Sequence, residues 1–245
     1  MIRVLISLAV LLALPGLALA QQSPADLLNV PINGSAAAWI IRTFGLLTVL
    51  SVAPGILVMV TSFPRFIIAF SILRSGMGLS TAPSNLVLVS MALFMTFYVM
   101  SPTFDKAWND GVQPLLQNQI NETVAVQRIA EPFRAFMTAN TRDKDLSLFV
   151  EIAREKNQSV GTPEAIDYRV LIPAFMLSEI RRGFEIGFLI VLPFLVIDMI
   201  VAAITMAMGM MMLPPTSISL PFKILFFVLI DGWNLLVGSL VRSFH

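Results

Sequence analysis

The sequence predicts an all-α integral membrane protein, built of helical hairpins with a helical extracytoplasmic (periplasmic) segment. Of its 245 residues, 57% are hydrophobic and only 13% are charged, whereas a typical soluble domain is about a quarter charged. Stretches almost free of charge at residues 43–64, 86–104, 186–208 and 224–241 have about the length that a membrane helix needs. One long charged stretch divides them into two pairs, which favours a hairpin on each side of a polar segment.

The composition also excludes several classes of function. The formal net charge is only +1, which argues against nucleic acid as a partner. The chain has no cysteine, and its one histidine is His245, so cysteine or multi-histidine metal sites and histidine-based catalytic triads are not expected. It also lacks a glycine-rich phosphate loop. We therefore expect no cofactor, no metal and no catalysis that depends on histidine or cysteine.

Residues 1–20 are typical of a secretory signal peptide. Arg3 gives a positive start, residues 4–14 are apolar, Pro15 and Gly16 break the run, and residues 18–20 read Ala-Leu-Ala. The run is too short for an uncleaved membrane anchor, which needs about 20 apolar residues. We expect cleavage before Gln21 and an exported mature N-terminus.

Residues 21–104 form an N-terminal region with the first pair of spans. After a polar loop, Pro54 and Gly55 fall in the middle of the first span and predict a kink or a break there. Residues 63–85 then connect the two spans. This stretch carries Arg65 and Arg74 and no acidic residue, which marks it as a cytoplasmic loop by the positive-inside rule.

Residues 105–185 form the polar segment. It holds 22 of the chain's 31 charged residues, ten basic and twelve acidic. Apolar residues recur with helical spacing over 123–138 and 145–156. Pro132 predicts a helix boundary, and residues 161–163 (Gly-Thr-Pro) predict a loop before a further helix. Counting spans from an exported N-terminus places this segment outside the cytoplasm, with its charges on a solvated or subunit-contacting face.

Residues 186–245 predict a second hairpin with a Met-Pro-Pro tip. Pro214 and Pro215 cannot continue a helix, so the chain turns there, and we assign Pro221 to the same turn. Just before the prolines stand Met210, Met211 and Met212. These methionines are either apolar filler at a helix end or, if several copies meet, a soft seal of adaptable thioether side chains.

Three charges interrupt the apolar stretches of this hairpin: Asp198, Lys223 and Asp231. An ionisable residue in a membrane segment usually faces a partner or a water-filled cavity. A pair between Asp198 and Lys223 within the hairpin needs an asymmetric turn, because the two lie at different distances from the tip. A pair between subunits does not need such a turn, and we expect Asp198, Lys223 and Asp231 to make contacts between subunits. Close helix approach is allowed by Gly183, Gly187, Gly209, Gly232 and Gly238.

Three functions fit these residues. The first is a subunit of an oligomeric channel or gate, with the methionine tip as its seal. The second is an intramembrane hydrolase that uses Asp198 and Asp231 as paired carboxylates, although no other catalytic polar group accompanies them. The third is a proton-coupled transporter with a membrane aspartate as proton carrier.

Four blocks, in order along the chain, carry a family resemblance, and the fourth consists of three short parts. They are residues 64–74 (PRFIIAFSILR), 171–180 (LIPAFMLSEI), 193–198 (PFLVID), 210–215 (MMMLPP), 220–223 (LPFK) and 231–233 (DGW). In these blocks the chain resembles the FliP family of type III secretion export-gate proteins. The resemblance runs from about residue 39 to residue 241, and residues 105–165 contain no matching block.

The resemblance implies a non-enzymatic core subunit of the flagellar export gate, in the bacterial inner membrane at the flagellar basal body. It implies a ring-like, helically rising assembly of five copies with FliQ and FliR, surrounded by membrane lipid, within a wider apparatus that includes FlhA and FlhB. Unfolded flagellar subunits would pass through this assembly. The methionine-rich gasket of the family maps onto Met210, Met211 and Met212. A virulence type III secretion system remains the alternative setting.

Overall fold

A computed structural model describes residues 43–45, 47–48, 51, 55–56, 58–162, 165–209 and 214–244. The chain forms two compact units, Met1–Pro54 and Gly55–His245. In the first unit, the described residues are helical. The predicted signal peptide over residues 1–20, the polar loop after it and the Pro54 kink lie outside the described residues.

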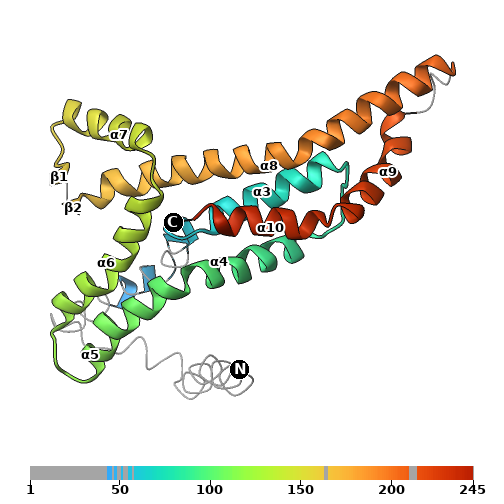
Figure 1. The fold of residues 1–245 in the computed structure, drawn as a ribbon. Coiled ribbons are helices and arrows are strands. Elements are labelled where there is room, and N and C mark those ends of the chain that lie inside the picture. Colours follow the sequence, from blue (N-terminus) through green and yellow to red (C-terminus); the bar gives the residue numbers. More distant parts are fainter. Residues whose placement is uncertain are drawn as a thin grey trace, which may run out of the picture. The chain divides into compact units, whose positions relative to one another are not determined.

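The second unit consists of helices and one short β-ribbon (Figure 1). Its helices are α3 (Phe63–Gly76), α4 (Asn85–Ala107), the π-helical turn η2 (Trp108–Val112), α5 (Gln113–Leu116), α6 (Glu122–Asn140), α7 (Asp143–Glu155), α8 (Tyr168–Ala207), α9 (Pro215–Leu229) and α10 (Gly232–Arg242). The ribbon pairs β1 (Gly161–Thr162) with β2 (Ala165–Ile166) in antiparallel register. The predicted all-α class is thus confirmed as a mostly helical chain.

Polar side chains fix where several of these helices begin. The Asn121 side chain accepts a hydrogen bond from the Val124 N–H at 2.9 Å at the start of α6. The Asp167 carboxylate likewise accepts one from the Arg169 N–H at 2.9 Å at the start of α8. Such caps satisfy N–H groups that have no partner in the first helical turn. Pro215 stands at the first position of α9, where its missing N–H costs nothing.

Helix α8 is the longest element, with 40 residues. At 1.5 Å per residue it is about 60 Å long, roughly twice the thickness of the hydrocarbon core of a bilayer. Its first half carries most of its charged residues, whereas Asp198 is the one charged residue from position 186 onwards. The predicted third span is therefore the second half of a longer helix, whose first half lies in the predicted polar segment.

Two described helices are long and apolar enough to cross a membrane, α8 and the continuous stretch from α4 through α5 (Asn85–Leu116). A third span results if α9 and α10, which meet at 63°, together count as one. The second half of α8 and the α4 stretch match the predicted third and second spans.

The contact between α3 and α8 organises the second unit. The two helices run parallel, and their contacts recur about every four residues with a glycine at each step. The facing residues are Gly183 with Ile68, Gly187 with Ile72, and Gly76 with Val191. A Cβ added at Gly187 would lie 3.0 Å from Ile72, and one at Gly76 only 2.4 Å from the Val191 methyl groups. The glycines therefore let the two backbones approach more closely than any side chain would permit.

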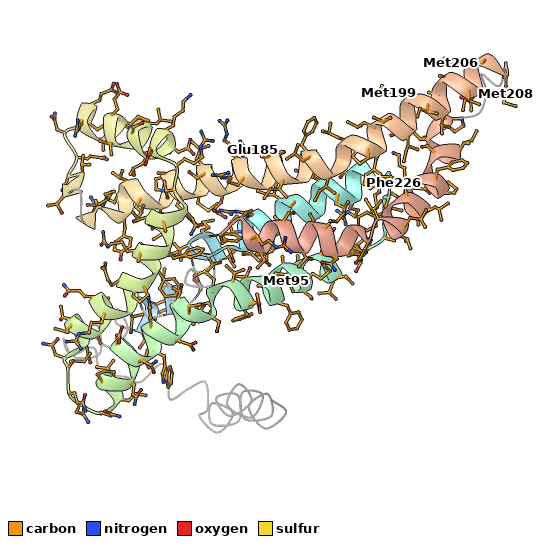
Figure 2. All side chains as sticks on the ribbon, in the orientation of Figure 1. Met95, Glu185, Met199, Met206, Met208 and Phe226 are labelled. Carbon is orange, nitrogen blue, oxygen red and sulfur yellow. The ribbon has the colours of Figure 1, made fainter. Side chains whose placement is uncertain are left out.

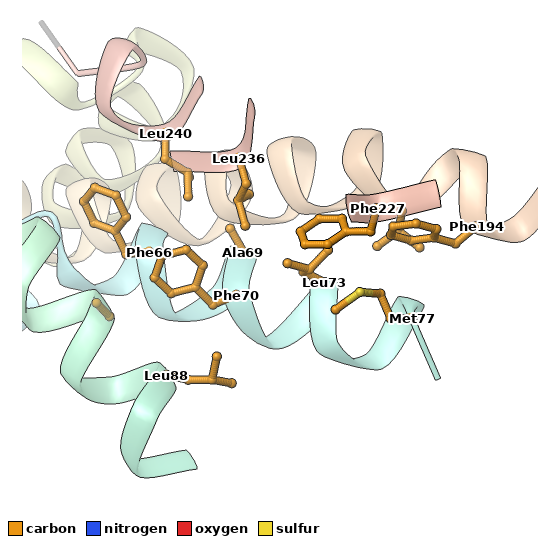
Figure 3. Close-up of a cluster of buried hydrophobic side chains, with 12 residues drawn as sticks. Phe66, Ala69, Phe70, Leu73, Met77, Leu88, Phe194, Phe227, Leu236 and Leu240 are labelled. Atoms are coloured by element: carbon orange, nitrogen blue, oxygen red, sulfur yellow. The ribbon is translucent and has the colours of Figure 1, made fainter. Parts of the chain in front are cut away.

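Two clusters of buried apolar side chains flank this contact. The larger one joins α3, α4, α8, α9 and α10 (Figure 3). It contains Phe66, Ala69, Phe70, Leu73, Met77, Leu88, Ala92, Val191, Phe194, Phe227, Leu236 and Leu240. The smaller one joins α6 to the first half of α8 and contains Val60, Met137, Leu171 and Phe175. The membrane hairpins and the polar segment thus have separate cores.

Some segment boundaries differ from those predicted. The predicted helices over 123–138 and 145–156 are confirmed as α6 and α7, but Pro132 lies inside α6 and does not end it. Residues 63–76 of the predicted loop form α3. The predicted segment boundaries after residues 104 and 185 fall inside α4 and α8. An interior proline costs a helix about 3 kcal/mol, and packing of a helix face on its neighbours can offset that amount.

The close α3–α8 approach gives a direct test. Replacing Gly187 by Leu should lower the free energy of unfolding by about 1–3 kcal/mol, because the added atoms must displace Ile72. Thermal unfolding of the purified protein in detergent measures this. The matched control is Gly238→Leu, since an added Cβ there meets no atom closer than 3.7 Å. Equal melting temperatures for the two variants would contradict the interface.

Candidate functional site

Helices α8 and α9 pack against each other as the predicted hairpin. Gly209 has a positive φ of 73°, a conformation that glycine adopts readily, just after α8 ends. Pro214 has an extended backbone, and Pro215 begins α9. The prediction that Pro221 belongs to the same turn is wrong, because Pro221 lies within α9. The helix continues through it because α9 packs along α8.

Exposed methionines lie along the second half of α8 and at its end. Met199, Met206 and Met208 are exposed by 64%, 61% and 67% respectively (Figure 2). Met210, Met211 and Met212, the predicted gasket, lie outside the described residues. The gasket remains a prediction, and the described neighbours show that the adjoining surface of α8 is also rich in methionine.

Lys223 connects three helices. Its Nζ donates hydrogen bonds to the Asp198 carboxylate on α8 at 2.5 Å and to the carbonyl of Gly76, the last residue of α3, at 3.1 Å. The Ser219 hydroxyl donates to the other carboxylate oxygen of Asp198 at 2.6 Å. The Lys223 side chain is only 4% exposed. The structure therefore pairs Asp198 with Lys223 inside one chain, the arrangement for which the turn must be asymmetric.

Asp231 has different surroundings. It lies at the bend between α9 and α10, where its backbone adopts a left-handed conformation with φ of 52°. Its side chain is exposed and lines a shallow pocket with residues such as Tyr98 and Asn234. Asp198 is instead bound by Lys223 and Ser219, so these aspartates do not form the carboxylate pair that a hydrolase requires.

Arg65 is not in a loop, contrary to the prediction. It lies in the first turn of α3 with 1% of its side chain exposed, and it forms a two-pronged ion pair with the fully buried Glu179 on α8. The distance from Arg65 Nε to Glu179 Oε2 is 2.9 Å. Arg74 lies in the last turn of α3 and donates to the Asn85 side chain at 2.5 Å, which holds the turn into α4.

Sequence reasoning missed Glu179 and the partners of Arg65 near the end of the chain. Arg65 Nη1 donates to the carbonyl and the hydroxyl of Ser243 at 2.9 and 2.7 Å, and its guanidinium lies 3.6 Å from the centre of the Phe244 ring. Glu179 stands in one of the blocks that carry the family resemblance, so that block was a usable signal. Nothing in the local sequence singles out Ser243 or Phe244.

An apolar groove of about 510 Å³ lies between α8 and α9 near the tip. Its lining comprises Ile197, Ile200, Val201, Ile204, Thr205, Met208, Ile218 and Phe222. Within the described ranges, no three side chains of histidine, cysteine, aspartate or glutamate are grouped so that they could hold a metal ion. The hairpin thus offers apolar contact area. Its described charged residues are Asp198 and Lys223, which pair with each other, and Asp231 at the α9–α10 bend.

The Lys223–Asp198 pair can be tested by a double-mutant cycle. Lys223→Met should destabilise the chain by about 2 kcal/mol or more, because it removes the cation that pairs with the Asp198 carboxylate and the Lys223 hydrogen bond to the Gly76 carbonyl. Adding Asp198→Asn should restore part of that loss. Unfolding in detergent measures both variants, with Lys144→Met on the exposed face of α7 as control. If the losses in the single variants Lys223→Met and Asp198→Asn simply add in the double variant, the two side chains are not energetically coupled.

Comparison with known proteins identifies the family. The family model described as "FliP family" matches residues 46–240. The flagellar biosynthetic protein FliP of Agrobacterium fabrum is 83% identical over 245 residues, and that of Rhizobium meliloti is 74% identical over 244, each match covering 100% of both chains. The FliP protein of Bacillus subtilis is 48% identical over 200 residues, which cover 81% of this chain and 89% of that protein. The chain therefore belongs to the FliP family.

Proposed function

We propose that this chain is a core subunit of the flagellar type III protein export gate in the bacterial inner membrane. Copies of it form the channel through which unfolded flagellar subunits leave the cytoplasm. The observation that carries this proposal is the α8–α9 hairpin. It combines a surface of exposed apolar side chains with charged residues turned inward at its base.

The exposed apolar surface of α8 supports an assembly of several chains. In the second half of α8, Leu189, Met199 and Ile200 are each more than half exposed. In the charged first half, Phe184 is also 56% exposed, next to Arg181 and Arg182. Because α8 is about twice as long as the hydrocarbon core is thick, lipid alone does not cover both halves. We infer that further copies, with FliQ and FliR as partners, cover this surface, and that FlhA and FlhB belong to the surrounding apparatus.

The methionine tip supplies the seal in this proposal. A gate for an extended polypeptide must exclude ions at rest and separate at low cost when a substrate arrives. Flexible apolar side chains do this by packing together and excluding water. In the sequence, Met210, Met211 and Met212 fall between α8 and α9, and in this proposal a ring of several copies brings them together.

The alternatives have less support. The relatives described above are flagellar proteins by name, which favours the flagellar system over a virulence secretion system. A proton-coupled transporter needs a membrane aspartate that is free to gain and lose a proton. Asp198 instead has partners inside the chain, because it accepts hydrogen bonds from Lys223 and Ser219.

Replacing Met210, Met211 and Met212 together by alanine tests the seal. The complex should still assemble, because the inward-facing contacts of the hairpin are unchanged, but the resting membrane should conduct ions. Conductance of cells or of reconstituted vesicles measures this, with Met199→Ala as a control for an exposed methionine of α8 away from the tip. Unchanged conductance in the triple variant at normal assembly would refute the gasket.

A further inference from the structure

Residues Ser243 and Phe244 extend beyond α10 and contact α3 and α6. Helix α10 ends at Arg242. The next residue gives its carbonyl and hydroxyl oxygens to Arg65 Nη1 on α3, at 2.9 and 2.7 Å. Since Arg65 binds Glu179 of α8 with its other nitrogens, one guanidinium joins α3, α8 and the end of α10.

The Phe244 ring completes this junction. It covers the Arg65 guanidinium at 3.6 Å, within the range of a cation–π interaction. It also stacks on Phe66 of α3 with ring centres 5.7 Å apart, and on Phe136 of α6 with ring centres 6.0 Å apart. Phe136 packs on the smaller buried cluster, whereas Phe66 belongs to the larger one. Phe244 therefore connects the core of the membrane hairpins with the core of the polar segment.

We propose that Ser243 and Phe244 form a C-terminal clamp, for which Arg65 is the receptor. The clamp fixes the end of α10 to α3, α6 and α8, and so sets the position of the α9–α10 pair relative to the α6–α7 segment. Ser243 and Phe244 are positioning residues in this proposal, since they act through Arg65 and Phe136. The clamp itself does not depend on the proposed gate function. Only its consequence rests on that function, namely that displacement of the α9–α10 pair impairs protein export.

The clamp requires an aromatic ring rather than mere bulk. An aliphatic side chain at position 244 fills space, but it offers no π face to the guanidinium and no ring to stack on Phe66 and Phe136. Phe244→Leu should therefore release the clamp, and Phe244→Tyr should keep it. Phe94→Leu is the matched control, because that ring lies 69% exposed on α4.

The first measurement is the distance between the two segments. The chain contains no cysteine, so spin labels at Gln127→Cys on α6 and Asn234→Cys on α10, both exposed positions, report only this pair. Full-length labelled protein is diluted with unlabelled protein, so that the distances arise within one chain. We expect a single narrow distribution for the parent and for Phe244→Tyr, and a broadened or shifted one for Phe244→Leu.

The second measurement covers stability and export. Phe244→Leu should lower the melting temperature in detergent by about 2–4 °C, the shift that a loss near 1 kcal/mol gives in a chain of this size. It should also reduce the amount of flagellar subunit secreted, and Phe244→Tyr should match the parent. Distances in Phe244→Leu that equal those of the parent would overturn the clamp. Displaced distances with normal secretion would overturn its consequence for export, and the conductance of the methionine variant tests the gasket independently.

Discussion

The parallel pairing of α3 with α8 is the contact on which the rest of the second unit depends. Glycines along both helices bring the backbones together, and an ion pair secures each end. Arg65 and Glu179 form one pair, while the other joins Lys223 to Asp198 and to the last carbonyl of α3. Buried charges are costly unless they are paired and hydrogen-bonded. The ion pairs therefore fix the register of the two helices, as well as the places where α9 and the chain end attach.

This arrangement explains how one chain can present an apolar hairpin without exposing the charges that hold it. Lys223 is turned inward to α8 and α3, so the outer surface of the α8–α9 hairpin keeps its exposed methionine, leucine and isoleucine side chains. At the opposite end of α3, Arg65 donates hydrogen bonds both to Glu179 and to Ser243, the residue after α10. The hairpin and the polar segment thus both attach to α3, and a substitution in α3 that breaks these contacts affects both of them.

Hydropathy and helical spacing predicted the helical class, the second span, and helices α6 and α7, because those signals are local. They failed where packing decides the outcome. Pro132 and Pro221 lie inside helices that neighbouring helices support. Arg65 appeared to be a loop cation, because its partner Glu179 is 114 residues away in the sequence. The pairing of Lys223 with Asp198 was one of two open arrangements, and only the three-dimensional structure distinguishes them.

The central claim is that the exposed apolar surface of α8 belongs to an oligomeric export gate. Native mass spectrometry after detergent extraction tests it most directly, with the protein expressed alone and then together with FliQ and FliR. The account predicts a discrete multimer in the first case, and the same multimer with both smaller membrane proteins added in the second. A stable monomer under both conditions would contradict the account, because the exposed apolar surface of α8 would then have no protein partner.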